Sequence, residues 1–224
     1  MTSCKEKLSM DELTKEFYKG CKQACGNNLQ IVGGDITGSE KIYVSICAIG
    51  KTQGRNISSR KNAQIGQKVI VSGVHGSSGA GLSLLLNKKA EPEKFIKSHL
   101  EPQAQILFGQ FLGENIKEKY ASMDTSDGLM DALSTIANES GVMLEVDFDK
   151  IPYDKDIEQF ENWKDMVLFG GEDYQIVATV PQNIDYGTQI GTVKEGLGVN
   201  LKFKSGFKLY TKQDVYNKIY NHFE

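Results

Sequence analysis

Long apolar runs are missing from this sequence of 224 residues. No stretch approaches the ~18–20 apolar residues that a membrane-spanning helix needs, and residues 1–11 are too polar and acidic for a secretory signal. Neither sign of charge dominates, because 26 Lys and Arg face 29 Asp and Glu, for a net charge of −3. Without a basic surplus, the composition gives no footprint for nucleic acid or an anionic membrane. We therefore expect a cytoplasmic protein that binds neither.

Cysteine and arginine are both scarce. The four cysteines all fall before residue 50: Cys4, Cys21, Cys25 and Cys47. They form no ladder of spacings, so reduced thiols are expected rather than a disulfide framework. Only two of the 26 cationic residues are arginines, Arg55 and Arg60, and both lie in one short segment. Arginine binds phosphate through two parallel hydrogen bonds, although chance clustering is the simpler interpretation of two neighbours.

What the chain does have is the composition of a globular protein. Hydrophobic residues make up 39% and charged residues 25% of the sequence, which excludes a disordered tail, a coiled coil and a collagen. At ~150 residues per typical domain, the length corresponds to one large domain or two small ones. A chain of this size buries roughly 70–75% of its unfolded surface, so a substantial core is expected.

The first 50 residues predict one helix and two strands. Ser9 and Glu12 form a capping box, and Leu13 and Phe17 then recur at helical spacing until Gly26 supplies a stop. Two apolar runs, 29–32 and 42–49, are typical of strands separated by a turn-rich segment. One helix and a two-stranded ribbon are too few elements for an independent core.

A second unit follows the polar segment 51–62. Its expected strands are 68–72, 142–147, 174–180, 189–194 and 199–204, the last two as a pair, and its expected helices are 82–86, 92–99, 102–117, 129–139 and 157–167, with a final segment over 211–223. Helices and strands thus alternate irregularly, with hairpin-like spacing near the end. This order favours the α+β class over a doubly wound parallel sheet.

Four glycines, Gly73, Gly76, Gly79 and Gly81, lie between a predicted strand and a predicted helix. They do not form the dinucleotide-binding pattern. A strand, a glycine-rich turn and a helix start present backbone N–H groups to a bound anion in many proteins. A tight turn with close helix packing explains the same glycines, and the sequence leaves both interpretations open.

Three short acidic turns are the most informative feature. They are Gly33-Gly34-Asp35, Asp124-Thr125-Ser126-Asp127-Gly128 and Gly170-Gly171-Glu172-Asp173. Each places a carboxylate beside glycine at the boundary of a predicted strand or helix, where oxygen ligands reach Mg²⁺ while waters and substrate phosphates complete its shell. A single such turn is usually a turn former or a helix cap. Three in one chain favour a magnesium-dependent phosphate site.

Five motifs, in this order and spacing, resemble the thiamine-monophosphate kinases, members of the superfamily named after aminoimidazole ribonucleotide synthetase. They are Ile31-Val32-Gly33-Gly34-Asp35, the glycine-rich segment 72–82, Asp124-x-Ser126-Asp127-Gly128-Leu129, Gly170-Gly171-Glu172-Asp173-Tyr174 and Tyr220-Asn221-His222-Phe223. The resemblance implies a remnant of the family's N-terminal ATP- and metal-binding domain over 1–58. It implies the family's C-terminal domain over 59–224.

The resemblance also implies an activity and a set of ligands. The ATP γ-phosphoryl group would pass to thiamine monophosphate, without a covalent phosphoenzyme, to give thiamine diphosphate. Metal ligands for Mg²⁺ would be Asp35, Asp124 and Asp127. ATP would contact Gly34, Asp35, Arg60 and Ser126, and the thiamine substrate would contact Glu172 and Tyr220. Two reacting anions need positive charge to offset their repulsion, which fits metal ions beside a guanidinium.

The sequence also departs from the family. Ile36 stands where the family has Thr or Ser, and Glu101 and Gln105 flank Pro102 where the family has Arg. The family's N-terminal acidic segment has no counterpart here, so we expect a second copy or a separate N-terminal polypeptide to complete the first domain. Two alternatives to the kinase remain open: a non-catalytic relative that binds nucleotide or thiamine phosphate, and another ATP-dependent synthetase of the superfamily.

Overall fold

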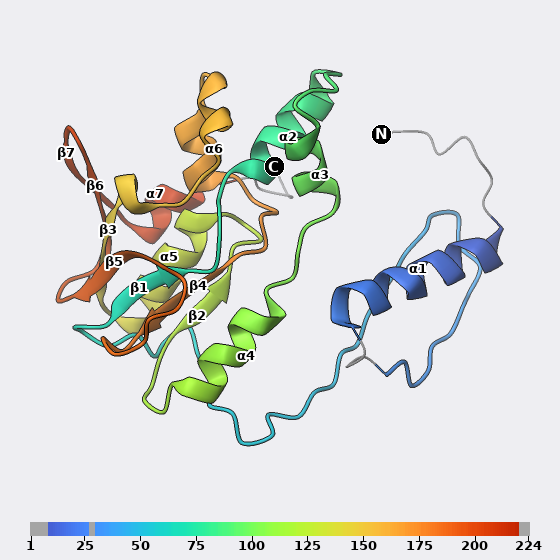
Figure 1. Ribbon diagram of the computed structural model, residues 1–224, viewed down its shortest axis with the longest axis horizontal. Helices are drawn as coiled ribbons and strands as arrows, with labels where there is room; N and C mark the ends of the chain where they lie inside the picture. The colour runs from blue at the N-terminus through green and yellow to red at the C-terminus, as the bar shows by residue number, and fades with distance from the viewer. Residues whose placement is uncertain (1–8, 27–29, 220–224) are drawn as a thin grey trace. The chain divides into compact units, whose positions relative to one another are not determined.

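The computed structural model describes residues 9–26 and 30–219 (Figure 1). The chain divides into two compact units, residues 1–51 and 52–224, and each is described by itself. The domain boundary expected from the resemblance, between residues 58 and 59, stays a prediction. No helix within the described ranges is long and apolar enough to cross a bilayer.

The first unit contains the predicted helix, α1 (Met10–Cys25). The Ser9 hydroxyl accepts a hydrogen bond from the Glu12 amide, and the Glu12 carboxylate accepts one from the Ser9 amide, so the capping box is confirmed. The helix ends at Gly26, whose φ of 61° lies in the left-handed region that glycine adopts without strain.

The two strands predicted for the first unit are not found. None of the described residues from 30 to 51 is in a strand. Their apolar side chains are open to solvent: Val32 is 88% exposed, Ile42 73% and Ile49 91%. A strand needs a hydrogen-bonding partner, and the described residues of this unit supply none. None of those residues is buried, in agreement with the expectation that this unit has no core of its own.

The second unit is built on a seven-stranded sheet in the order β2-β4-β1-β5-β3-β6-β7. The strands are β1 (Lys68–Val71), β2 (Ser122–Asp124), β3 (Met143–Asp147), β4 (Ile176–Val180), β5 (Thr188–Lys194), β6 (Gly198–Phe203) and β7 (Gly206–Tyr210). Neighbours run antiparallel except β3 and β6, which are parallel. Such a mixed sheet confirms the α+β class.

The expected pairing of the last two predicted strands is wrong. β5 and β6 follow each other in the chain, but β3 lies between them and pairs with both. Two strands, β2 and β7, were not predicted at all. β2 has only three residues, too few to show an alternating pattern. β7 alternates over only Phe207, Lys208 and Leu209, which is shorter than the roughly four to eight residues that identify a half-buried strand.

Six helices accompany the sheet in the described part of this unit. They are α2 (Ser77–Leu86), α3 (Glu93–Leu100), α4 (Ile106–Asn115), α5 (Leu129–Ser140), α6 (Trp163–Phe169) and α7 (Lys212–Tyr216), with 3-10 turns at Phe148–Lys150 and Lys155–Gln159. The expected helices 92–99 and 129–139 are confirmed to within a residue at each end. The expected helix 157–167 is instead a 3-10 turn followed by α6.

Apolar side chains fill both faces of the sheet. Val69 and Val71 of β1 belong to the larger cluster, which contains much of α5 and α6. Ile70, between them, faces the opposite side and packs with Phe108 and other residues of α4, beside β2 and β4 in Figure 1. The alternation of a strand thus places helices on both faces.

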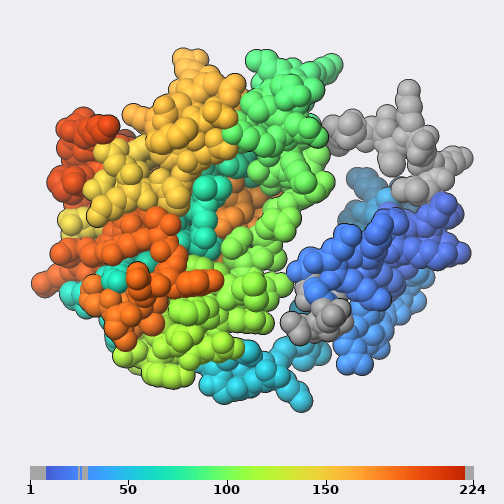
Figure 2. Space-filling model, viewed as in Figure 1, coloured from blue at the N-terminus to red at the C-terminus, as the bar shows by residue number. Residues whose placement is uncertain are grey.

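Glycine permits the close packing of α2 against its neighbours. A Cβ on Gly81 would lie 2.1 Å from the Phe95 carbonyl oxygen of α3, and one on Gly76, at the start of α2, would lie 2.9 Å from the Val167 backbone of α6. Figure 2 shows α2 and α3 as one continuous surface next to α6. The packing interpretation of the glycine-rich segment is therefore confirmed.

Candidate active site

Backbone hydrogen bonds join two of the three acidic turns. The Thr125 amide donates to the Gln175 carbonyl oxygen at 2.9 Å, and the Gln175 amide donates to the Thr125 hydroxyl at 3.0 Å. The Glu172 amide donates to the Ser126 carbonyl oxygen at 2.8 Å. Because Thr125 is fully buried, these bonds are shielded from water, and the two turns form one structural unit.

The glycines of these turns allow the backbones to approach. A Cβ on Gly171 would lie 2.5 Å from the Ser126 carbonyl oxygen. Gly128 has a φ of 105°, and its added Cβ would meet the Phe169 backbone at 3.0 Å. An L side chain fits neither position without displacing backbone. The motif glycines are therefore explained by the contact between the turns.

The carboxylate of Asp173 is buried and anchors the acidic turn at residues 170–173. It accepts hydrogen bonds from the Gly76 amide at 2.6 Å and the Ser78 amide at 2.9 Å, both at the start of α2. Burial raises the pKa of Asp173 to about 6, against the lowering effect of the two amide donors. On either side, Glu172 and Tyr174 have positive φ values of 67° and 49°. A positive φ costs a non-glycine residue ~1–3 kcal/mol. The hydrogen bonds of Asp173 help to hold the turn in this conformation.

The same contact answers the question left open by the glycine-rich segment. Its backbone N–H groups do bind an anion, but the anion is the side chain of Asp173. A helix N-terminus satisfied in this way has no donors left at these positions for a phosphate. Asp173 therefore takes two of the amides that the phosphate-binding interpretation would need, and for the other amides of the glycine-rich segment that interpretation stays a prediction.

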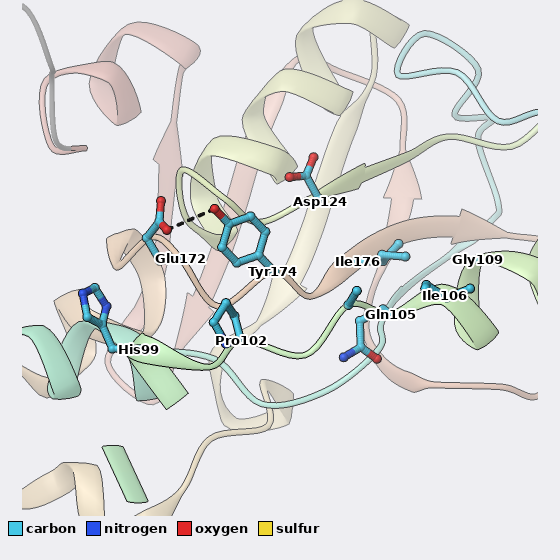
Figure 3. A pocket seen from close by; sticks show the side chains of 10 residues that line it. His99, Pro102, Gln105, Ile106, Gly109, Asp124, Glu172, Tyr174 and Ile176 are labelled. Atoms are coloured by element: carbon cyan, nitrogen blue, oxygen red, sulfur yellow. Dashed lines mark hydrogen bonds between the residues drawn. The ribbon is translucent and has the colours of Figure 1, made fainter. Parts of the chain in front are cut away.

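Three carboxylates act on the hydroxyl of Tyr174. This hydroxyl donates a hydrogen bond to Glu172 Oε2 at 3.0 Å (Figure 3). Burial raises the pKa of Tyr174, and the hydrogen bond to Glu172 raises it further. The negative charges of Glu172, Asp124 and Asp127 act in the same direction. Across the described residues, no Lys or Arg forms an ion pair with these three carboxylates, so the negative charge is uncompensated.

A pocket of about 680 Å³ opens beside these groups (Figure 3). Its lining residues are His99, Pro102, Ala104, Gln105, Ile106, Gly109, Asp124, Glu172, Tyr174 and Ile176. The walls are mainly apolar and aromatic, with two carboxylates and one imidazole as the polar groups able to bind a ligand strongly. This is the usual design of a small-molecule site.

Comparison with known proteins identifies the family of this chain. Residues 64–199 match the family model for AIR synthase related protein, C-terminal domain. A thiamine-monophosphate kinase of Aquifex aeolicus (strain VF5) is 39% identical over 215 residues, which cover 88% of this chain and 67% of the relative. The chain belongs to the thiamine-monophosphate kinase family.

Solved structures of this family show the same fold. The crystal structure of thiamine monophosphate kinase from Aquifex aeolicus has a TM-score of 0.74 and 32% identity, and the match covers 92% of this chain and 71% of that one. A structure of AaThiL complexed with AMPPCP and TMP has a TM-score of 0.71 and 33% identity, covering 92% and 70%. The predictions of the family and of its fold are thus confirmed.

Four residues that the resemblance to thiamine-monophosphate kinases singled out lie on the joined turns. Asp124 and Asp127 are exposed, Ser126 between them is half-buried, and Glu172 is exposed on the facing turn. β2 ends at Asp124, and α5 begins at Leu129, so the turn lies between a sheet strand and a helix start. The structure therefore brings these four residues together from two distant segments.

Arg60, a predicted ATP ligand of the kinase family, lies elsewhere in the second unit. Its carbonyl oxygen accepts a hydrogen bond from the Ser140 hydroxyl at 2.9 Å, at the C-terminal end of α5. Asp127 precedes the opposite end of that helix, which has 12 residues and is therefore about 18 Å long. The structure does not place Arg60 beside the acidic turns, and its role with ATP stays a prediction.

The structure does not test three further predicted residues. Gly34 and Asp35 belong to the first unit, and Asp35 Oδ1 accepts a hydrogen bond from the Ile36 amide at 2.9 Å. Tyr220 falls outside the described residues. Their roles, in ATP binding, metal binding and substrate binding, stay predictions.

The carboxylates on the acidic turn at residues 124–128 fit Mg²⁺. No group of three or more metal-ligating side chains gathers within residues 9–26 and 30–219. Mg²⁺ in phosphoryl-transfer enzymes needs only one or two carboxylates, because waters and substrate phosphates fill the other positions. Asp124 and Asp127 are exposed, lack a cationic partner among the described residues, and supply hard oxygen ligands.

Sequence reasoning missed two residues of the pocket. Tyr174 belongs to the Gly-Gly-Glu-Asp-Tyr motif, which is an identifiable signal, but no role was assigned to it. His99 forms no catalytic motif with Ser or Cys in the sequence, yet it lies in the last turn of α3 and lines the pocket. Its only signal in the sequence is its place three residues before Pro102.

Proposed function

We propose that this protein transfers the γ-phosphoryl group of ATP to thiamine monophosphate, forming thiamine diphosphate and ADP. An oxygen of the substrate phosphate attacks the γ-phosphorus. The bond from that phosphorus to the bridging oxygen breaks, and ADP leaves with the electron pair. Family membership and the pocket beside the acidic turns support this proposal. The AaThiL structure, described with AMPPCP and TMP, supports the choice of ligands.

The uncompensated charge of the pocket is the observation that carries the proposal. Its walls of Pro102, Ile106 and Ile176 suit a flat apolar ring. Its carboxylates, Asp124 and Glu172, suit a cation, and its lining contains no Lys or Arg from the described part of the chain. The thiazolium ring of thiamine is flat and permanently positive, and the ring of Tyr174 adds an aromatic face that attracts cations.

Asp124 links this pocket to the phosphate-transfer turn. It lines the pocket and also lies three residues before Asp127, so a thiamine head group in the pocket directs its phosphate toward this turn. Asp124 and Asp127 would hold Mg²⁺ there, which supplies the positive charge that lets two phosphates approach. Ser126, between them, would donate a hydrogen bond to the nucleotide.

The remaining assignments extend this proposal. Gly34, Asp35 and Arg60 would contact ATP, with Asp35 as a further metal ligand, and Tyr220 would contact thiamine. The exposed apolar residues of segment 30–51 support completion of the first unit by a second copy or by a separate N-terminal polypeptide. Light scattering at micromolar concentration tests this, and a monomeric mass with no added polypeptide would contradict the homo-oligomer.

Product formation is the decisive test. With ATP, Mg²⁺ and thiamine monophosphate, we expect thiamine diphosphate by chromatography. The D124N variant should lose at least about a hundredfold in kcat, since it removes a metal ligand and leaves the turn in place. D185N is a matched control, because Asp185 is exposed and has no partner among the described residues. Equal turnover by D124N and D185N would refute the assignment of Asp124.

The same assay separates catalysis from simple binding. A relative that only binds thiamine phosphate would show a higher melting temperature with thiamine monophosphate but no product. The alternative has one structural observation in its favour, the first unit without buried residues in its described part. If an added N-terminal polypeptide restores product formation, the kinase proposal holds.

A further inference from the structure

His99 is held in a defined orientation at the wall of the pocket. It lies in the last turn of α3, lines the pocket beside Glu172 and Tyr174 (Figure 3), and its Nδ1 is 2.9 Å from the Ser78 hydroxyl. Ser78 is fully buried in α2. The close packing of Gly81 against Phe95 fixes α2 and α3 relative to each other. The imidazole is therefore preorganised, which favours binding because little freedom is lost.

The buried hydroxyl determines which nitrogen of His99 carries the proton. The Ser78 amide is already used by Asp173, and within the described part of the chain His99 is the partner given for the Ser78 hydroxyl. If Nδ1–H donated to Ser78, the hydroxyl proton would be buried with no acceptor, which is costly. Ser78 therefore donates to Nδ1, and neutral His99 carries its proton on Nε2. Nε2–H is then the free donor of the ring.

We propose that His99 is a further substrate-binding residue, whose Nε2–H donates to a ring nitrogen of the ligand while Glu172 accepts from an adjacent amino group. One oxygen of Glu172 is used by Tyr174, and the other is left for the ligand. A donor beside an acceptor matches the edge of an aminopyrimidine, which presents an amino group next to a ring nitrogen. This inference rests on the proposed function, because the aminopyrimidine ring is the second ring of thiamine.

Two substitutions at position 99 separate binding from structure. In H99N the side-chain amide reaches the position of Nδ1, so the contact with Ser78 is kept and the donor toward the pocket is lost. In H99Q the amide reaches the position of Nε2, so the donor is kept and the contact with Ser78 is lost. We expect H99N to weaken the Kd for thiamine monophosphate about tenfold, and H99Q to stay within about threefold of wild type. A residue with only a structural role gives the opposite order.

A ligand analogue tests the pairing directly. When an oxygen replaces the amino group of the pyrimidine, the adjacent nitrogen gains a proton, and the donor and acceptor exchange places. Wild type should bind this analogue more weakly than thiamine monophosphate by about a hundredfold, because both hydrogen bonds are lost. H99N should discriminate about tenfold less. Unchanged discrimination in H99N would overturn the role of His99.

The tautomer is open to measurement without any ligand. Nitrogen-15 NMR of the whole chain, with His99 assigned through the missing signal in H99Q, should show protonation at Nε2. A proton on Nδ1 would overturn the inference even if H99N failed to fold. Wild type that binds no thiamine monophosphate, alone or with the completing polypeptide, would overturn the proposed function and this inference with it. Wild type that binds it equally to H99N overturns only the inference.

Discussion

Replacing Asp173 by asparagine should change how stability depends on pH. In the folded chain the pKa of Asp173 is about 6, against an ordinary value of 3.8, because the carboxyl is buried. A raised carboxyl pKa means that the folded state holds the proton more tightly than the unfolded state. The stability that protonated Asp173 gives the folded chain is therefore fully present below pH 3.8 and is lost as the pH rises through about 6. The amide of D173N does not titrate.

The size of the effect follows from the two pKa values. A difference of about two pH units corresponds to ~3 kcal/mol, since each unit is worth 1.36 kcal/mol. The free energy of unfolding of wild type, measured relative to that of D173N, should thus fall by ~3 kcal/mol between about pH 3.5 and pH 7.5. D149N provides the control, because Asp149 is exposed and its substitution leaves the buried carboxyl of Asp173 in place.

Urea unfolding followed by tryptophan fluorescence is a suitable assay. The chain has a single tryptophan, Trp163, whose ring centroid lies 5.8 Å from that of Phe148 in the core of the second unit. The signal therefore reports the unit that contains Asp173. If the difference between wild type and D173N stays flat across this range, the amides at the start of α2 fully offset the burial, and the reasoning is refuted.

Two further predictions concern the same unit. Burial lowers the pKa of His75 to about 3, and both of its ring nitrogens are buried with no hydrogen-bond partner among the described residues. The stability present above pH 6.5 is therefore lost as the pH falls toward 3. The H75L variant has no imidazole to protonate. Its free energy of unfolding, measured with urea, should rise relative to that of wild type by ~1.4 kcal/mol per pH unit below 6.5. Equal pH dependence of the two chains would contradict this prediction. G171A should lower turnover at least tenfold and destabilise by roughly 1–3 kcal/mol, because its Cβ would lie 2.5 Å from the Ser126 carbonyl oxygen. The control is G20A, whose added Cβ meets no described atom within 4 Å and should lower neither turnover nor stability. A G171A chain as active and as stable as G20A would show that the turns need no close contact.

Local signals in the sequence predicted the elements that depend on local chemistry. The capping box at Ser9 located α1, and the apolar spacing from Leu129, closed by Gly141, located α5. The predicted strands 29–32 and 42–49 failed for the opposite reason, because a strand exists only with a partner. The pairing of β5 and β6 failed because β3, distant in sequence, lies between them.

The sequence likewise predicted some residues of the candidate site and missed others. The acidic turns of Asp124 and Glu172 were recognisable as motifs, and the structure brings them together. The use of Asp173 as a buried anchor was not predictable, because its partner Gly76 is 97 residues away. His99 was missed for the same reason, since its orientation depends on a buried hydroxyl of another helix.

The three hydrogen bonds between the acidic turns have a consequence for affinity. Glu172 and Asp127 are mounted on one rigid piece of backbone, so a ligand that shifts either residue must strain the other. Under the proposed function, binding of a ligand at Glu172 and binding of one at Asp127 are therefore expected to be energetically coupled. Whatever factor one ligand imposes on the dissociation constant of the other is returned in full.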